Sequence, residues 1–428
     1  MRREGDRRWP QLLALGVLTL APGLAQAQEA LQVRVGSKPM GEVPAFATSG
    51  FNYGNSMLIV GSEAEYEAIR VDWLRFPPGN QADEIVLGEP DLAALELNLG
   101  LLDRPPVMMV ANLFEGTPQQ AAGLARLTKE REIPVLAWEI GNEPDLYGSN
   151  RGDPSWTPAR YCEEFRRFRT ALLEVDPSYL LAGPAASGAR PGGEAYLREV
   201  VRRCGDVIDI LTWHIYPTDG TWTDAAALAT SGQFSDEYRR YRNWAADPEA
   251  NPLGFGRELR YGVTEFGLSW RSSSYRHLED MTATLWLADV LGQMTRERLD
   301  FSSYFTLQGM GGHGLIGTGG WLRPTYHLYR MLGDFTGSVL PADAELPLRA
   351  YAVSSRGEVR LLLINHDDRE FKAQLHFEAK TTADLEVTTL SESIFDELLK
   401  PMTTRASVSD PLLVPARAVI LVRARQSE

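Results

Sequence analysis

Cysteine, histidine and long apolar runs are all scarce in this chain of 428 residues. The two cysteines are Cys162 and Cys204, and the six histidines are dispersed, so none of them has the spacing of a metal site. We expect neither a metal nor another cofactor. Beyond the first 27 residues, no apolar run is long enough to cross a bilayer. The composition therefore argues against a metalloprotein and against membrane-spanning helices.

Positive charge is also in deficit. The chain has 43 Lys and Arg against 57 Asp and Glu, which gives a formal net charge of -14. An acidic surface of this size argues against nucleic acid or an anionic membrane as the main partner. It does not exclude an anionic sugar, because a binding site can carry its own cations.

The first 27 residues have the pattern of a signal peptide. Several arginines precede an apolar run at residues 12–20, and Ala25-Gln26-Ala27 has the small-residue form that signal peptidase cleaves. A short membrane anchor is the alternative, although the run is too short to span a bilayer. We expect a secreted or periplasmic protein with a mature chain from about Gln28. Such a compartment permits a disulfide between Cys162 and Cys204, with two buried thiols as the alternative.

Short β-rich runs alternate with longer amphipathic stretches between residues 46 and 335. The predicted strands are 46–52, 68–76, 106–112, 133–140, 179–183, 207–214, 260–265 and 300–307. The predicted helices are 62–67, 90–102, 117–132, 157–175, 193–204, 235–246, 275–298 and 324–332. Eight strands, each followed by a helix, predict an α/β fold of the (β/α)8 TIM-barrel type. An open doubly wound sheet is the alternative, but no glycine-rich phosphate-binding turn follows the first strand.

The sequence pattern changes after the barrel. Residues 336–428 contain short β-rich runs at 349–354, 358–365, 371–377, 385–390 and 418–422. This pattern predicts a C-terminal antiparallel β-sandwich domain. The segment 28–45, before the barrel, includes a β-like run at 31–35 that we expect to pair with the sandwich.

Polar side chains stand at the predicted carboxyl ends of the barrel strands, where the active face of such a barrel lies. The second strand leads to Arg75 and Asn80, the fourth to Asn142 and Glu143, the sixth to His214 and Tyr216, and the seventh to Glu265. The eighth leads through Gln308 into a glycine-rich loop with His313, Trp321 and Arg323. A single Glu at a strand end is most often a turn residue. Glu143 and Glu265 together form a carboxylate pair that suits the cleavage of glycosidic bonds.

The run Trp138-Glu139-Ile140-Gly141-Asn142-Glu143-Pro144, taken with Glu265, resembles the clan A retaining glycoside hydrolases built on (β/α)8 barrels. The resemblance covers the whole mature chain, including the appended sandwich. Residues 139–144 with the following Asp145-Leu146-Tyr147 are similar to glycoside hydrolase family 79, the β-glucuronidase and heparanase group. Families 39, 51 and 30 share the same plan and stay open. Pro77-Pro78-Gly79-Asn80 is also similar to a loop of the arabinofuranosidase group, with Pro78 in place of a glycine.

The resemblance implies a retaining β-glycosidase with Glu143 as the general acid/base and Glu265 as the nucleophile. Retention requires the two carboxyl groups to lie about 5 Å apart. Asn142 would bind the sugar 2-hydroxyl, while Arg75 and Tyr216 would keep Glu265 ionised.

Further residues are assigned from their places at the strand ends. His214 would bind a hydroxyl or orient Glu265, with a hydrogen-bonded histidine of no chemical role as the alternative. Asn80 and Gln308 are further substrate-binding candidates, and Trp321 is expected to stack on a sugar face. Trp138 is expected to pack inside the barrel, with Glu139 pointing the opposite way.

An exo-acting β-glucuronidase is the expected enzyme, and its substrate carboxylate would need a cation. Arg271, His313 and Arg323, on the loops after the seventh and eighth strands, are the candidates, since arginine binds carboxylate bidentately. A β-xylosidase, an arabinofuranosidase or an endo-glucanase of the same clan is the alternative. A non-catalytic carbohydrate-binding barrel is an alternative of another class, although such a protein would normally lack one carboxylate or the asparagine.

Overall fold

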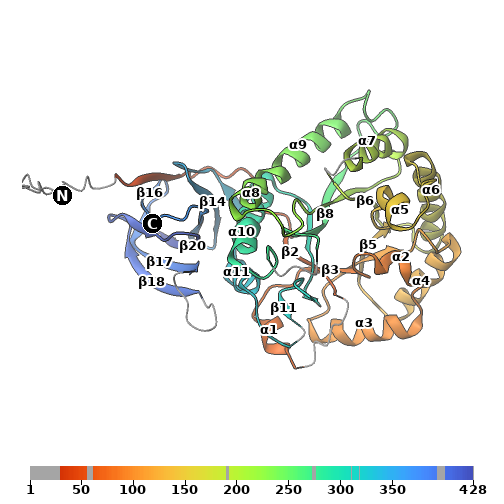
Figure 1. Ribbon diagram of the computed structural model, residues 1–428, viewed down its shortest axis with the longest axis horizontal. Coiled ribbons are helices and arrows are strands. Elements are labelled where there is room, and N and C mark those ends of the chain that lie inside the picture. Colours follow the sequence, from red (N-terminus) through yellow and green to blue (C-terminus); the bar gives the residue numbers. More distant parts are fainter. Residues whose placement is uncertain are drawn as a thin grey trace, which may run out of the picture.

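The computed structural model describes residues 29–54, 61–188, 192–271, 276–309, 311–317, 319–392 and 401–427. The expected signal peptide at 1–27 lies outside the described residues. Within them, the chain forms a closed parallel barrel beside a β-sandwich (Figure 1). The predicted fold class, a (β/α)8 barrel with a C-terminal sandwich, is therefore confirmed.

The barrel consists of eight strands that follow one another in chain order. They are β2 (Phe46–Asn52), β3 (Trp73–Phe76), β4 (Val107–Ala111), β5 (Val135–Ile140), β6 (Leu181–Ala186), β7 (Ile210–Ile215), β8 (Arg260–Phe266) and β9 (Phe301–Tyr304). Strand β9 pairs with β2 and closes the barrel. The fourth and seventh barrel strands, which precede or carry the two candidate glutamates, are thus β5 and β8.

Helices cover the outside of the barrel. The longer ones after the strands are α3 (Glu89–Leu101), α4 (Pro118–Glu130), α6 (Pro158–Val175), α7 (Gly193–Cys204), α9 (Gln233–Ala246), α10 (Met281–Glu297) and α11 (Pro324–Leu332). Shorter ones are α1 (Glu63–Glu67), α2 (Gln81–Glu84), η1 (Pro144–Leu146), α5 (Tyr147–Asn150), α8 (Asp224–Leu228) and η2 (Ala229–Gly232). Thr117 and Thr157 cap two of these helices, because their side chains accept hydrogen bonds from backbone N–H groups of the first turns of α4 and α6.

The two faces of the barrel strands are both buried, but they differ in what they contact. Inside, one layer consists of Trp73, Met108, Ala137, Ala182, Ile210 and Phe301. Trp138 alternates with Ala137 and therefore faces the helices, where its ring meets that of Tyr179 with centroids 6.1 Å apart. The prediction that Trp138 packs inside the barrel is wrong. Glu139 faces the interior instead and forms an ion pair there with Arg75.

The C-terminal domain is built from two sheets. One has the strand order β12-β14-β15-β20-β17-β18, and the other has the order β13-β1-β16-β19. The strands are β1 (Leu31–Val35), β12 (Ser338–Leu340), β13 (Ala342–Ala344), β14 (Leu348–Ser355), β15 (Glu358–Asn365), β16 (Phe371–Phe377), β17 (Thr381–Ser391), β18 (Met402–Ser407), β19 (Leu412–Val414) and β20 (Ala418–Gln426). Strand β1 pairs in parallel with β16 and antiparallel with β13, so the chain before the barrel contributes a strand to this domain.

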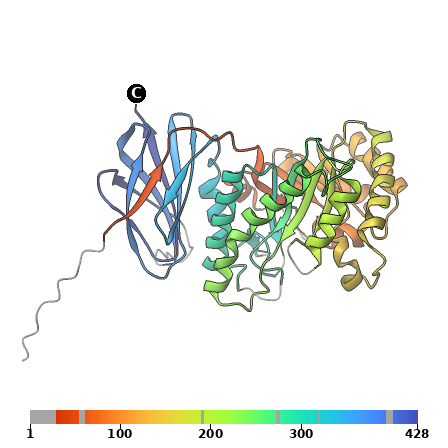
Figure 2. The same cartoon turned by 90° about the horizontal axis from the view of Figure 1, so that it is seen from above.

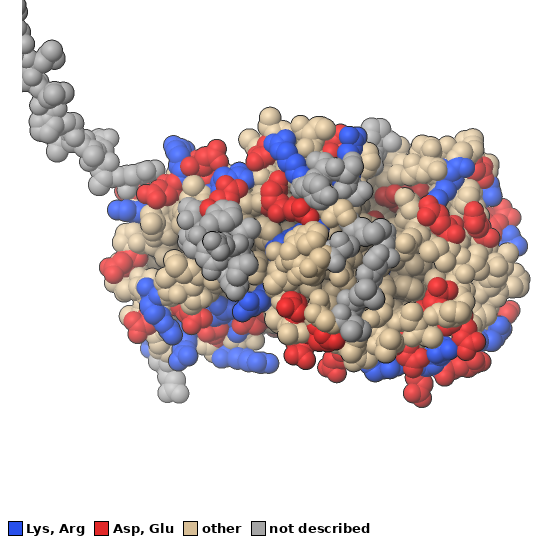
Figure 3. Space-filling view, turned by 60° about the horizontal axis from the view of Figure 1, so that its bottom comes forward, with Lys and Arg blue, Asp and Glu red and all other residues tan. Residues whose placement is uncertain are grey.

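The sandwich lies against helix α10 of the barrel (Figure 2). At this contact the hydroxyl of Tyr351 donates to Asp289 Oδ1 at 2.6 Å, and Arg349 Nε lies 2.9 Å from Asp289 Oδ2. The face shown in Figure 3 carries acidic and basic side chains interspersed over both domains. On this face, neither sign of charge gathers in one large patch.

The sequence also raised the questions of a disulfide and of membrane-spanning helices. Cys162 of α6 and Cys204 of α7 form a disulfide, which settles the alternatives that the sequence left open. Of the helices in the described ranges, none combines the length and the apolar composition that a bilayer span requires.

Candidate active site

A cavity of about 920 Å³ opens at the carboxyl ends of the barrel strands. Its walls come from the segments after β3, β5, β7, β8 and β9. The lining residues that matter below are Gly79, Asn80, Glu84, Asn142, Glu143, Arg151, Tyr216, Glu265, Trp270, Phe305 and His313. Both candidate carboxylates thus face the same space.

Glu143 owes its position to a strained turn just beyond β5. Gly141 has φ +80°, and Glu143 itself has φ +49°, in the left-handed region that non-glycine residues seldom adopt. The backbone N–H of Glu143 donates to the carbonyl of Ala185 at 3.0 Å, which ties the turn to the end of β6. Strain of this kind persists only where the surroundings impose it, and it is concentrated at functional sites.

The residues after Glu143 anchor this turn on both sides. Asp145 accepts hydrogen bonds from the backbone N–H and the hydroxyl of Ser187, beyond β6. Tyr147 donates to Asp83 Oδ2 at 2.7 Å, and the same oxygen accepts the backbone N–H of Asn142 at 3.2 Å. Burial raises the pKa of Asp83 to about 6, although these hydrogen bonds oppose the shift. The sequence offered Asp145-Leu146-Tyr147 only as part of a resemblance, and it offered no signal for Asp83.

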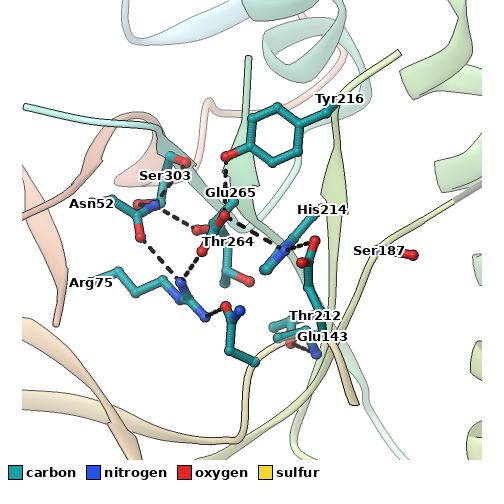
Figure 4. Close-up of polar contacts among 12 residues, drawn as sticks. Asn52, Arg75, Glu143, Ser187, Thr212, His214, Tyr216, Thr264, Glu265 and Ser303 are labelled. Carbon is teal, nitrogen blue, oxygen red and sulfur yellow. Dashed lines mark hydrogen bonds and ion pairs between the residues drawn. The ribbon is translucent and has the colours of Figure 1, made fainter. Parts of the chain in front are cut away.

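Glu265, near the end of β8, is held by a cation and a hydroxyl. Arg75 Nη1 lies 2.5 Å from Glu265 Oε1, and Tyr216 donates to Glu265 Oε2 at 3.0 Å (Figure 4). Burial would lower the pKa of Arg75, but the carboxylates of Glu139 and Glu265 raise it, so the guanidinium stays charged. Burial and the negative charge of Glu265 raise the pKa of Tyr216 far above its ordinary value, so the phenol remains a donor.

His214 stands between the two candidate glutamates, as Figure 4 shows. Its Nδ1 lies 3.1 Å from Glu143 Oε1 and 3.7 Å from Glu265 Oε2. Burial lowers the pKa of His214, although Glu265 acts in the opposite direction, so the ring is neutral near pH 7. Its Nε2 has no hydrogen-bond partner among the described residues.

The shared nitrogen limits the separation of the two carboxylates. The oxygens Glu143 Oε1 and Glu265 Oε2 cannot lie farther apart than the sum of their distances to His214 Nδ1. That limit reaches only the lower end of the ~6.5–9.5 Å range of inverting glycosidases, whereas retaining enzymes need about 5–5.5 Å. This limit on one pair of oxygens is compatible with the retaining arrangement.

The structure places the sequence-derived candidates in three positions. Asn80, Asn142, Glu143, Tyr216 and Glu265 line the cavity. Arg75 and His214 are not among the residues that line the described cavity; their side chains are fully buried, and both contact Glu265. Gln308, Trp321 and Arg323 are not among the residues that line the described cavity.

Each of these last three has another contact. Gln308 accepts a hydrogen bond from Tyr66. Trp321 packs over the glycines of its own loop, against Gly317. The guanidinium of Arg323 is buried and binds Glu279 and the carbonyls of Gly311 and Gly314, contacts that hold its loop.

Other aromatic residues form the cavity wall in their place. Trp270, on the loop after β8, lines the cavity and is 45% exposed, so it can stack on a sugar face. The ring of Phe305 meets those of Tyr216 and His313 edge-on, with centroids 6.3 and 5.1 Å away. Burial lowers the pKa of His313 to about 4, so this wall, adjacent to Glu265, is uncharged at neutral pH. The sequence could have suggested Trp270, because it follows Glu265 by five residues.

The cavity has a cation that the sequence reading did not identify. Arg151, at the end of α5, lines the cavity, and its Nη1 lies 2.6 Å from Glu84 Oε1. Arg271, which the sequence put forward, instead lies 3.6 Å from Asp219 and over the ring of Trp270. Of the three cations put forward for a substrate carboxylate, only His313 lines the cavity, and it is neutral.

The chain resembles known proteins in its structure but not in its sequence. No protein-family model matches the sequence, and no curated protein sequence matches it. Solved structures do. An alpha-L-arabinofuranosidase from Thermotoga maritima aligns with a TM-score of 0.74 at 14% identity, covering 92% of this chain and 100% of that one. A family 51 alpha-L-arabinofuranosidase from Bifidobacterium longum aligns with 0.71 at 14% identity, covering 92% and 99%.

A beta-xylosidase from Caulobacter crescentus aligns with a TM-score of 0.67 at 16% identity, covering 93% of this chain and 100% of that one. At such identities the likeness shows the fold alone. This chain has the barrel-and-sandwich fold of these glycoside hydrolases over nearly its whole length.

Proposed function

We propose that this protein is a secreted retaining glycoside hydrolase that cleaves O-glycosidic bonds by double displacement. Glu265 is the nucleophile and Glu143 is the general acid/base. The observation that carries the proposal is the meeting of these two carboxylates, from separate strands, at one imidazole nitrogen beside a sugar-sized cavity. The leader-like pattern of residues 1–27 and the disulfide support secretion.

In the first step, a Glu265 oxygen attacks the anomeric carbon while Glu143 gives its proton to the departing glycosidic oxygen. The sugar is then bound to Glu265 as an ester. In the second step, Glu143 removes a proton from water, the water oxygen attacks the anomeric carbon, and Glu265 leaves as a carboxylate. Arg75 and Tyr216 each hold one oxygen of Glu265, so the nucleophile is oriented beside a positive charge before the first step.

Asn142 is suited to the sugar hydroxyl next to the reacting carbon. Its Oδ1 accepts a hydrogen bond from Arg75 Nη2 at 2.9 Å, which fixes the amide so that its Nδ2 donors point away from the arginine. The side chain lines the cavity beside Glu143. A hydrogen bond from this amide to the 2-hydroxyl would strengthen as the oxocarbenium-like transition state forms.

For the glycone, the resemblance to family 79 favours a β-glucuronide, and Arg151 is the residue that we propose binds its carboxylate. Among the described residues, this guanidinium binds Glu84 and the carbonyl of Asn80 at 3.2 Å, and it lies over the ring of Phe114. The side chain of Glu84 is 52% exposed, so a substrate carboxylate can replace it at modest cost. We expect Arg151→Gln to lower kcat/KM for a β-glucuronide about 10- to 100-fold, while Arg202→Gln, which removes a matched charge paired with Glu199 on α7, leaves it unchanged.

One observation favours a neutral glycone instead. The wall beside Glu265, made by Tyr216, Phe305 and His313, carries no charge at neutral pH. A xyloside, a glucoside or an arabinofuranoside would lie against this wall without a cation. If Arg151→Gln has no effect and neutral glycosides are hydrolysed faster, this second assignment is the correct one.

The deciding experiment is hydrolysis of nitrophenyl β-glucuronide, β-xyloside, β-glucoside and α-L-arabinofuranoside, with the first product followed by NMR. The first anomer formed is expected to keep the configuration of the substrate. An inverted first product would contradict the double displacement. A protein that binds sugars but hydrolyses none of them, with the same affinity in Glu265→Gln, would be a carbohydrate-binding barrel.

A further inference from the structure

Beneath the cavity lies a buried row of three charges. Arg75 Nε is 2.6 Å from Glu139 Oε2, and Arg75 Nη1 is 2.5 Å from Glu265 Oε1. The side chains of Glu139 and Arg75 are fully buried, and that of Glu265 is 6% exposed. One cation is therefore shared between two carboxylates, and only one of the two carboxylates faces the cavity.

Glu139 is fixed in this row from the other side as well. Its Oε1 accepts the hydroxyl of Thr264 at 2.8 Å, and Thr264 directly precedes Glu265 on β8. The remaining partners of the guanidinium are amide oxygens, Asn52 Oδ1 at 3.1 Å and Asn142 Oδ1 at 2.9 Å. Within the described part of the chain, the negative charges bonded to Arg75 are thus those of Glu139 and Glu265.

The charge of this row changes during the proposed reaction. In the free enzyme, two carboxylates face one guanidinium. When a Glu265 oxygen bonds to the anomeric carbon and the glycosidic oxygen leaves with the proton of Glu143, Glu265 becomes a neutral ester. Arg75 and Glu139 then form a balanced pair. Without Glu139, the covalent intermediate would leave an unpaired cation buried below it, which is unfavourable.

We propose that Glu139 is a positioning residue that acts through Arg75 to stabilise the glycosyl-enzyme intermediate relative to the free enzyme. This rests on the proposed function. With Glu139 neutralised, Arg75 would bind the ionised Glu265 more strongly, so attack on the sugar slows. The same cation would draw Glu265 back to its ionised form, so release of the sugar accelerates. The two half-reactions therefore respond in opposite directions.

The test measures the two half-reactions separately in Glu139→Gln. A 2,4-dinitrophenyl 2-deoxy-2-fluoro-glycoside of the best wild-type substrate traps the ester, and dinitrophenolate release gives the rate of its formation. Reactivation after removal of excess reagent gives the rate of its breakdown. We expect formation to slow at least about tenfold and breakdown to accelerate about threefold or more. Glu139→Asp keeps the charge and should restore both rates toward wild type.

A second variant covers the case in which Glu139→Gln fails to fold. Thr264→Val removes the hydroxyl bound to Glu139. As in Glu139→Gln, formation of the ester should slow and its breakdown should accelerate, each by about two- to threefold. The matched control is Thr295→Val, which removes a buried hydroxyl bonded to a carbonyl within α10. That variant should leave both rates unchanged.

Other outcomes overturn the inference. If formation and breakdown slow together, or if neither changes in Glu139→Gln and Thr264→Val, Glu139 has only a structural role. If wild type hydrolyses no glycoside and traps no ester, the proposed function fails first. A wild-type enzyme that forms the ester, with variants that do not show opposed effects, refutes this inference alone.

Discussion

The two candidate glutamates are the same residue type in two different settings. Glu265 lies within β8, its side chain is 6% exposed, and it pairs with a fully buried arginine. Glu143 lies beyond the end of β5 on a left-handed turn, its side chain is 17% exposed, and it meets the neutral His214. A cation therefore lies at one carboxylate and a neutral ring at the other, so the two glutamates differ in the charge beside them.

The two glutamates also differ in what holds them in place. The barrel itself fixes Glu265, because strand pairing sets its position between β7 and β9. Glu143 depends on a turn that Asp145 and Tyr147 tie to neighbouring segments. Changes around Glu265 should therefore affect its charge, and changes around Glu143 should affect its placement.

The largest effect expected comes from removing each carboxylate in turn. Glu265→Ala should lower kcat/KM at least ~10⁴-fold on every glycoside, because no covalent intermediate can form. Glu143→Ala should lose about 10²- to 10⁴-fold on a substrate with a poor leaving group and much less on a dinitrophenyl glycoside, which needs no proton. Steady-state kinetics on both leaving groups measures the difference.

Azide distinguishes the two variants chemically. In Glu143→Ala it should restore turnover and give a glycosyl azide of retained configuration, because it attacks the ester in place of water. In Glu265→Ala it should give the inverted azide from direct displacement. The reverse pattern, read by NMR, would exchange the two roles.

A smaller effect is expected from the hydroxyl that orients Glu265. Tyr216→Phe removes a hydrogen bond to an ionised carboxylate, worth about 1.5–3 kcal/mol, so kcat/KM should fall roughly 10- to 100-fold. The control is Tyr326→Phe, whose hydroxyl binds the carbonyl of Glu65. Equal losses in both variants would mean that the effect is not specific to the nucleophile.

The anchoring of Glu143 should show in stability more than in rate. Burial raises the pKa of Asp83 from its ordinary value to about 6, so the folded protein binds a proton there more tightly than the unfolded chain does. The contribution of protonated Asp83 to the free energy of unfolding is fully present below about pH 4. It is lost as the pH rises through 6, a change of about 3 kcal/mol. Urea unfolding from pH 4 to pH 7 should show the stability advantage of wild type over Asp83→Asn shrinking by about 2.4 kcal/mol, which is most of that amount. A constant difference between the two proteins would contradict the assignment.

The strand order of the barrel could be predicted, because it depends on the alternation of β-rich runs with longer amphipathic stretches. The runs at 46–52, 193–204 and 324–332 match β2, α7 and α11. Boundaries failed where a local contact overrides the pattern. Strand β3 starts at Trp73, not at residue 68, because α1 ends in a turn there. Helix α10 starts at Met281, not at residue 275, because Asp280 caps it.

The direction of side chains was harder to predict than their place at strand ends. Both faces of a barrel strand are apolar, so the pattern alone did not show that Trp138 faces the helices and Glu139 the interior. Arg323 was placed correctly in its loop, but its partner Glu279 lies far away in sequence. Arg151 escaped notice because only the folded loops bring α5 and α2 together.

The smallest effect on chemistry should come from the disulfide, which lies on the Glu143 side of the barrel yet touches neither carboxylate. Cys162 and Cys204 enclose a separation of 42 residues, so the cross-link stabilises the fold by about 4 kcal/mol through the entropy of the unfolded chain. In the variant with both cysteines changed to Ala, urea unfolding should show this loss, while kcat/KM at 25 °C stays within about twofold of wild type. A large fall in kcat/KM without a change in the product anomer would mean that α6 and α7 hold the β6 segment to which the Glu143 turn is tied. The position of Glu143 would then depend on α6 and α7 as well as on the contacts of Asp145 and Tyr147, whereas Glu265 would still be fixed by the barrel strands alone.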